Sequence, residues 1–181
     1  GTATQVIFST IQNNLNSLTR LKQSIESSYL SATANAARTR ILAAVAAFEN
    51  ALGAIQSTDQ QVQETITAAK QLPNLPLLAS QAQQLSTNPN NGTQALLAII
   101  TNSLATLQGL PTTFSSTTDA AAAQSSADAL YVTAQQILTQ NTTILQNSAA
   151  LNGLIATAQH ALPAPPPQTP APTSHPPQQT S

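Results

Sequence analysis

The chain has 181 residues, of which only 6% are charged, and its formal net charge is −1. Gln, Asn, Ser and Thr supply the polarity instead, so the chain lacks the electrostatic field that attracts nucleic acid or an anionic membrane. There is no cysteine, which excludes disulfides and thiolate chemistry. We therefore expect a neutral, uncross-linked protein that does not bind nucleic acid.

Residues 2–29 are expected to form the first helix. Apolar side chains recur there in steps of four and three, which keeps them on one side of a helix. The stripe consists of Phe8, Ile11, Leu15, Leu18, Ile25 and Tyr29, with Lys22 in one position. Its phase slips by two residues before the next apolar run. We therefore expect a break within 31–35, with Thr33 or Asn35 as the next N-cap.

A second helix is predicted for residues 36–72. Its stripe keeps the same spacing and consists of Ile41, Val45, Phe48, Leu52, Ile55, Val62, Ile66 and Ala69. Asp59 occupies a stripe position and Gly53 weakens the helix locally, so a cap and kink at Asp59 is the alternative. Residues 73–76 begin and end with proline and form a tight corner.

Two shorter elements follow this corner. Residues 77–85 have room for one short helix, and residues 86–92, reading STNPNNG, form the clearest loop in the chain. Residues 93–108 return to helix, with Leu97, Ile100, Leu104 and Leu107 on one face. Gly109 is expected just past the C-cap of that helix.

The last helix is predicted for residues 119–162, after a crossing at 110–118 in which Phe114 is an anchor and Thr118 or Asp119 is the cap. Its main stripe consists of Ala123, Ala127, Leu130, Ala134, Ile137, Asn141, Ile144, Ser148, Leu151, Ile155, Ala158 and Leu162. A second column beside it consists of Tyr131, Leu138, Leu145 and Leu154. Such a helix is roughly 65 Å long, so the other helices should align along it.

These elements predict an all-α, up-and-down bundle of four to five helices over residues 1–162. Residues 163–181 hold eight of the chain's twelve prolines among Gln, Thr and Ser, so they form no core. We expect a disordered tail or an extended stalk there. No window of about twenty residues is free of polar side chains, so no transmembrane segment is expected. A start at Gly1 suits a processed, secreted chain.

Residues with catalytic or metal-binding chemistry are few and scattered. The two histidines are His160, in the last turn of the long helix, and His175 in the tail. The six carboxylates form no pair on adjacent turns, and the five glycines form no phosphate-binding loop. We expect no enzyme, no catalytic residue, no metal site and no cofactor.

Two tripeptides match the N-glycosylation pattern, beginning at Asn91 and Asn141. Asn91 lies in the predicted loop and is the glycosylation candidate. Asn141 lies on the predicted stripe, where a single buried asparagine sets the register of paired helices.

The apolar interior is the remaining candidate site. Small side chains in such a core permit either close helix packing without a ligand or an unfilled channel that an acyl chain occupies. The residues assigned to this core or lining are Leu97, Ile100, Leu104, Leu130, Ile137, Ile144 and Leu151.

The segments VIFSTIQNNLNSLTRLKQSIESSYL and ILAAVAAFENALGAIQS resemble the opening of the fungal hydrophobic-surface-binding protein A and cell-wall galactomannoprotein family. A looser match runs from Ala95 through Phe114 to Leu138. The resemblance implies a secreted helical bundle that binds fatty acids or adsorbs to hydrophobic surfaces. The tail and the length of the last helix depart from the family pattern.

A second segment, AQQILTQNTTILQNSAALNGLIATAQHA, is similar to the closing helix of the minor pilus subunits of type IV secretion systems. That resemblance implies export and self-association. We therefore expect an extracellular or cell-surface protein that binds hydrophobic surfaces or lipids, with a structural subunit of a pilus-like or filamentous assembly as the alternative.

Overall fold

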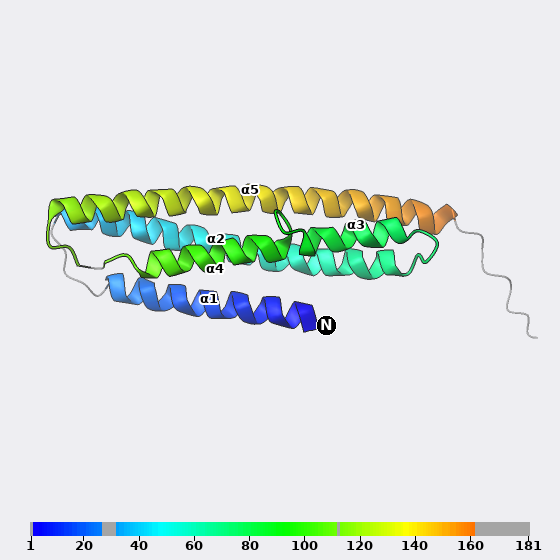
Figure 1. Cartoon of the computed structure of the whole chain (residues 1–181), viewed down its shortest axis with the longest axis horizontal. Helices are drawn as coiled ribbons and strands as arrows, with labels where there is room; N and C mark the ends of the chain where they lie inside the picture. The colour runs from blue at the N-terminus through cyan, green and yellow to red at the C-terminus, as the bar shows by residue number, and fades with distance from the viewer. Residues whose placement is uncertain (1, 27–31, 112, 162–181) are drawn as a thin grey trace, which may run out of the picture.

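The structure is a computed structural model, and it describes residues 2–26, 32–111 and 113–161. This part of the chain contains five α-helices and no strand (Figure 1). They are α1 (Thr2–Glu26), α2 (Ala32–Lys70), α3 (Pro76–Thr87), α4 (Thr93–Gln108) and α5 (Thr117–Ala161). The predicted all-α class, the helix number and the long last helix are confirmed. The predicted tail of residues 163–181 lies outside the described residues.

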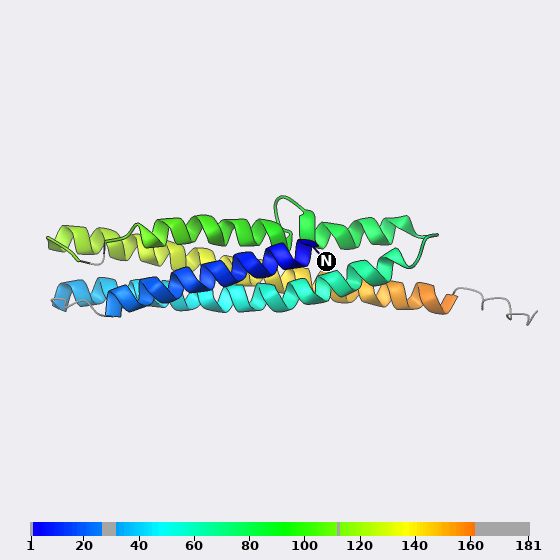
Figure 2. The ribbon, with the colours of Figure 1, turned by 90° about the horizontal axis from the view of Figure 1, so that it is seen from below.

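The helices run along one long axis, and the chain reverses between α1 and α2, between α2 and α3, and between α4 and α5 (Figures 1 and 2). α3 and α4 follow each other in the same direction, with a loop between them, and together form one side of the bundle. The predicted up-and-down topology is therefore confirmed, with α3 and α4 together taking the place of one long helix.

α2 and α5 run parallel and share the most extensive helix–helix contact. Near their starts, Arg40 Nη1 lies 2.8 Å from Asp128 Oδ1. Toward their ends, Thr65 Oγ1 lies 2.9 Å from Asn152 Oδ1. The two longest helices are thus held side by side over most of the bundle.

Small side chains fill the α2–α5 interface at seven-residue intervals, the spacing that keeps one seam between paired helices. The buried members are Ala37, Ala44, Ala51, Thr58 and Thr65 on α2, and Ala120, Ala127, Ala134, Asn141 and Ser148 on α5. The hydroxyl oxygens of Thr65 and Ser148 lie 2.8 Å apart. This pair fixes the register and places the earlier members of both series level with each other. We call this interface the α2–α5 seam.

α1 covers only part of this scaffold. It packs against α2 and α4, and within the described residues it has no contact with α3 or α5. Its N-terminal end lies near the middle of the bundle, close to the break between α3 and α4 (Figure 2). The other half of the bundle is built from α2, α3 and α5.

The bounds of α2 differ from the prediction at both ends, since the helix starts four residues earlier and ends two residues earlier, at Lys70. The helix begins at Ala32, so Thr33 and Asn35 lie inside it and neither is its N-cap. Alanines at 32, 34, 36 and 37 are strong helix formers, which accounts for the earlier start. α2 also continues without a break through Gly53 and Asp59, so the alternative of a cap and kink at Asp59 is wrong.

α3 is longer than predicted at both ends. Pro76 is its first residue, where the missing N–H of proline costs no helical hydrogen bond. Ser86 and Thr87, which were expected in the loop, belong to its last turn. The loop itself is stabilised by Asn88 Oδ1, which accepts the backbone N–H groups of Asn90 at 2.9 Å and Asn91 at 3.3 Å.

α4 has the predicted bounds, but Gly109 is its C-cap and not the residue after it. The φ of Gly109 is −79°, so no left-handed turn ends the helix. Phe114, the predicted anchor, is partly buried and packs against the core.

The predicted caps of α5, Thr118 and Asp119, are wrong because the helix begins at Thr117. Ser116 is the cap, since its Oγ accepts the backbone N–H of Asp119 at 3.1 Å. The hydroxyl of Ser115 also donates to Asp119 Oδ2 at 2.6 Å. Asp119 thus takes part in the cap from inside the first turn.

The buried faces follow the predicted stripes in α2, α4 and the main stripe of α5. In α1 the prediction is wrong by one residue at three positions. Phe8 is 53% exposed and Ile7 is buried, Lys22 is exposed and Leu21 is buried, and Leu15 is only partly buried whereas Asn14 is buried. The second column of α5 is a packing face only in part: Tyr131 is 41% and Leu154 is 54% exposed, whereas Leu138 is partly buried and packs against the core. Tyr29 and Leu162 lie outside the described residues.

One helical stretch, 34–70, is apolar and long enough to cross a membrane by length and composition. Half of its apolar 18-residue window is buried inside the bundle, and the core helix of a soluble protein meets the same criterion. The absence of a transmembrane segment stays a prediction.

Candidate functional site

A buried carboxyl lies where α1, α2 and α4 meet. Asp59 of α2 is only 3% exposed. Its Oδ1 accepts the hydroxyl of Thr93, the first residue of α4, at 3.3 Å, and the side-chain amide of Gln63 at 3.4 Å. Asp59 therefore connects α2 to the start of α4 beneath α1.

No positively charged side chain of the described residues faces Asp59. Residues 2–19 of α1 carry no charged side chain, and neither do α3 and α4. The one ion pair between described residues, Arg40 with Asp128, is exposed and lies elsewhere. Burial raises the pKa of Asp59 above its ordinary value of 3.8, and the hydrogen bonds from Gln63 and Thr93 lower it only in part.

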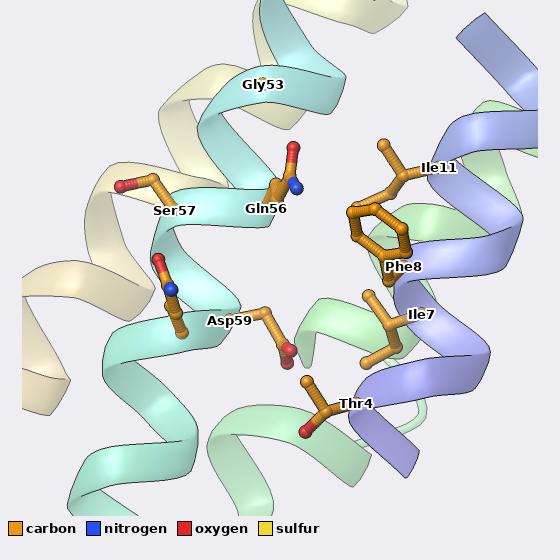
Figure 3. Close-up of a pocket in the computed structure, with 9 residues that line it drawn as sticks. Thr4, Ile7, Phe8, Ile11, Gly53, Gln56, Ser57 and Asp59 are labelled. Carbon is orange, nitrogen blue, oxygen red and sulfur yellow. The ribbon is translucent and has the colours of Figure 1, made fainter. Parts of the chain in front are cut away.

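Asp59 borders a pocket of about 270 Å³ between α1 and α2, which we call the α1–α2 pocket. Figure 3 shows its two unlike walls: α1 presents apolar side chains, and α2 presents polar ones. Its residues are Thr4, Ile7, Phe8, Ile11, Gly53, Gln56, Ser57, Asp59 and Gln60. The Asp59 carboxyl points toward Thr4 and Ile7 (Figure 3). A methyl group at Gly53 would meet no atom within 4 Å, so this wall is open.

A second groove, of about 370 Å³, lies on the other side of α1 against α4. Its walls include Val6 and Thr10 from α1, and Leu97 and Thr101 from α4. Further along, the side-chain amide of Asn14 donates to Thr101 Oγ1 at 3.2 Å and ties the two helices together. Hollows therefore flank the N-terminal half of α1 on both sides.

The seven predicted lining residues all lie in one continuous buried core. Three of them also reach surface hollows. Leu97 borders the α1–α4 groove, and Ile144 and Leu151 border a groove of about 540 Å³ between α3 and α5. All seven are at most 9% exposed. That any of the seven lines a ligand channel stays a prediction.

The predicted glycosylation candidate, Asn91, is exposed at the edge of the α3–α5 groove. Asn141 is 4% exposed in the α2–α5 seam, as its position on the stripe predicted. Glycosylation of Asn91 stays a prediction.

The α1–α2 pocket was not predicted from the sequence. The position of Asp59 on the stripe of α2 was the available signal of its burial, but its partner Thr93 lies 34 residues away. No group of three or more His, Cys, Asp or Glu side chains that could hold a metal occurs in the described part of the chain. The site therefore offers one buried carboxyl beside an apolar wall, an arrangement suited to binding.

Comparisons with protein-family models, with curated proteins and with solved structures found no match for this chain. The two family resemblances stay predictions, and the function is argued from the geometry.

Proposed function

We propose that this protein is a non-catalytic helical bundle that binds hydrophobic surfaces or lipids, outside the cell or at its surface, and that α1 makes the first contact. One observation carries the proposal. The N-terminal half of α1 has apolar side chains on its outer face, where Val6 is 59% and Phe8 is 53% exposed, as well as on its inner face.

Contact with an apolar phase would stabilise this helix through both faces. Burying a side chain of the size of Val or Phe contributes about 1.5–3 kcal/mol. The outer residues Val6 and Phe8 gain this on first contact. If α1 then separates from the bundle, Ile7 and Ile11 exchange one apolar environment for another, so separation costs less at the surface than in water.

The packing of α1 supports this role. α1 contacts only α2 and α4 within the described residues. Residues 2–19 hold no charged group that would have to leave an ion pair. A chain with 6% charged residues is also held at an apolar surface by burial of area and not by a long-range field. We therefore expect adsorption that is insensitive to salt.

The test locks α1 to the bundle. The chain has no cysteine, so Asn14→Cys with Thr101→Cys gives one pair for a short bis-maleimide crosslinker between α1 and α4. The matched control is Arg40→Cys with Asp128→Cys, which links α2 to α5 through an exposed pair. Adsorption is measured on an alkyl-coated sensor and on neutral phospholipid vesicles.

Crosslinking α1 to α4 should reduce adsorption several-fold relative to the same protein before crosslinking, whereas the α2–α5 link should have little effect. Equal adsorption of locked and unlocked protein would show that α1 does not separate. If the wild type stays in solution but forms polymers in native mass spectrometry, the structural-subunit alternative is correct instead.

A further inference from the structure

We propose that the α1–α2 pocket binds a small amphiphilic primary amine, with the ammonium group at Asp59 and the alkyl chain against Ile7, Phe8 and Ile11. This proposal goes beyond surface adsorption because it requires α1 to stay in place, and the ligand would compete with an apolar surface for Ile7, Phe8 and Ile11. The pocket joins the two features that such a ligand needs, a carboxyl without a cationic side chain among the described residues and an apolar wall.

The Asp59 carboxyl has an oxygen that can accept a hydrogen bond from the ligand. Both of its hydrogen bonds are accepted by Oδ1, so Oδ2 has no donor among the described residues. An ammonium group brings three N–H donors and a positive charge. Oδ2 would accept one of them, and Thr4 and Gln60 are further polar residues in the lining of the same pocket.

The surrounding charges select a cation. The elements packed around Asp59 present no Lys, Arg or His: α1 is uncharged over 2–19, and α4 is uncharged throughout. The nearest charged residue along α2 is Glu64, another carboxylate, in the adjoining groove that Thr4 and Gln60 also line. A fatty-acid carboxylate would be repelled here, and an alcohol would leave the charge of Asp59 unpaired.

The size of the pocket limits the ligand. Ligand pockets usually occupy about 300–1,000 Å³. At about 270 Å³ this pocket is filled by a short alkyl chain, and the rest of a long acyl chain would extend beyond its open wall at Gly53. Phe8 is the single aromatic side chain in the wall, so there is no aromatic cage of the kind that holds a quaternary ammonium. A primary amine therefore fits better than a choline-like group.

The experiment compares hexylamine with 1-hexanol and hexanoate at neutral pH on the wild-type protein, by calorimetry and by the methyl NMR signals of Ile7 and Ile11. Because a charge-assisted hydrogen bond replaces a neutral one, hexylamine should bind about tenfold tighter than 1-hexanol. Hexanoate should not bind. Equal affinity for the amine and the alcohol in the wild type would overturn the proposal without any variant.

Two variants test whether Asp59 is the carboxylate that pairs with the amine. Asp59→Asn keeps an acceptor for Thr93 but should remove the preference for hexylamine, whereas Glu64→Gln should keep it. A preference that survives Asp59→Asn would also overturn the proposal. The protein with α1 crosslinked to α4 separates this inference from the proposed function, because it should still bind hexylamine after losing adsorption.

Discussion

Thr58 of α2 and Asn141 of α5 lie level with each other in the α2–α5 seam, one heptad before the hydroxyl pair of Thr65 and Ser148. Thr58 Oγ1 and Asn141 Oδ1 are buried oxygens without a hydrogen-bond partner in the described part of the chain. One level of the α2–α5 seam therefore has hydrogen-bonded side chains, and the level before it has two buried oxygens without a partner. An unsatisfied buried polar group costs about 1–3 kcal/mol.

This contrast predicts opposite effects for the same substitution at two sites. Thr58→Val removes an oxygen without a partner at almost unchanged volume, so it should stabilise the protein by about 1 kcal/mol. Thr65→Val removes an oxygen that lies 2.8 Å from Ser148 Oγ and 2.9 Å from Asn152 Oδ1, so it should destabilise by about 1–2 kcal/mol. Urea denaturation of both variants measures the difference. A loss of stability in Thr58→Val would mean that its hydroxyl has a partner in solution, such as a buried water.

Ile137 and Ile144 test whether the main stripe of α5 is packed core. Both are at most 4% exposed. Each Ile→Ala change should reduce the free energy of unfolding by about 2–5 kcal/mol, through lost burial and the cavity left behind. Chemical denaturation with and without a fatty acid checks this. Small losses in the ligand-free protein, with altered affinity for the fatty acid, would instead favour the lipid-channel interpretation.

The raised pKa of Asp59 predicts a pH-dependent stability. Burial favours its protonated form in the folded state, so its stabilising contribution is fully present below the unfolded pKa and is lost as pH rises through the folded pKa. From about pH 4 upward, the wild type should lose more stability than Asp59→Asn. Urea midpoints at several pH values measure this difference. Glu64→Gln is the control and should follow the wild type.

Gly92 and Gly153 should respond differently to alanine. A Cβ at Gly92 would lie 2.5 Å from the backbone oxygen of Ser86, so Gly92→Ala forces the loop and the start of α4 apart. A Cβ at Gly153 would meet nothing within 4 Å, and alanine in a helix is favoured over glycine by about 0.5–1 kcal/mol. Thermal denaturation should therefore show a lower Tm for the first variant and a higher Tm for the second. Equal shifts would contradict the close approach at Gly92.

Spacing predicted the fold well where a stripe was long and unambiguous. α4 has the predicted bounds, and all the predicted stripe residues of α2 are buried, because a repeat sustained over many turns permits one phase only. In α1 the three consecutive apolar residues Val6, Ile7 and Phe8 fit more than one phase. The packing of α1 against α2 and α4, which selected Ile7, is not encoded in the spacing of α1 itself.

The N-cap of α5 and the α1–α2 pocket could not be predicted from the local sequence, for two different reasons. Residues 115–119 are all able to cap a helix, so composition did not distinguish Ser116 from Asp119. The pocket requires α1, α2 and α4 to meet around Asp59. This contact depends on where the N-terminal end of α1 lies relative to α2 and α4. The sequence indicated a polar residue on a buried face and nothing about the helices above it.

The parallel pairing of α2 and α5 also determines the order in which the molecule can fold. Thr65 and Ser148 are 83 residues apart in sequence, so the seam closes only after a large loop has been ordered. Contacts of α2 with α3 span much shorter loops and cost less entropy to form. We expect refolding to produce helical structure early and the seam late. The side chains that set the final register, Thr65 and Ser148 among them, would then act on the unfolding rate far more than on the initial rate of collapse.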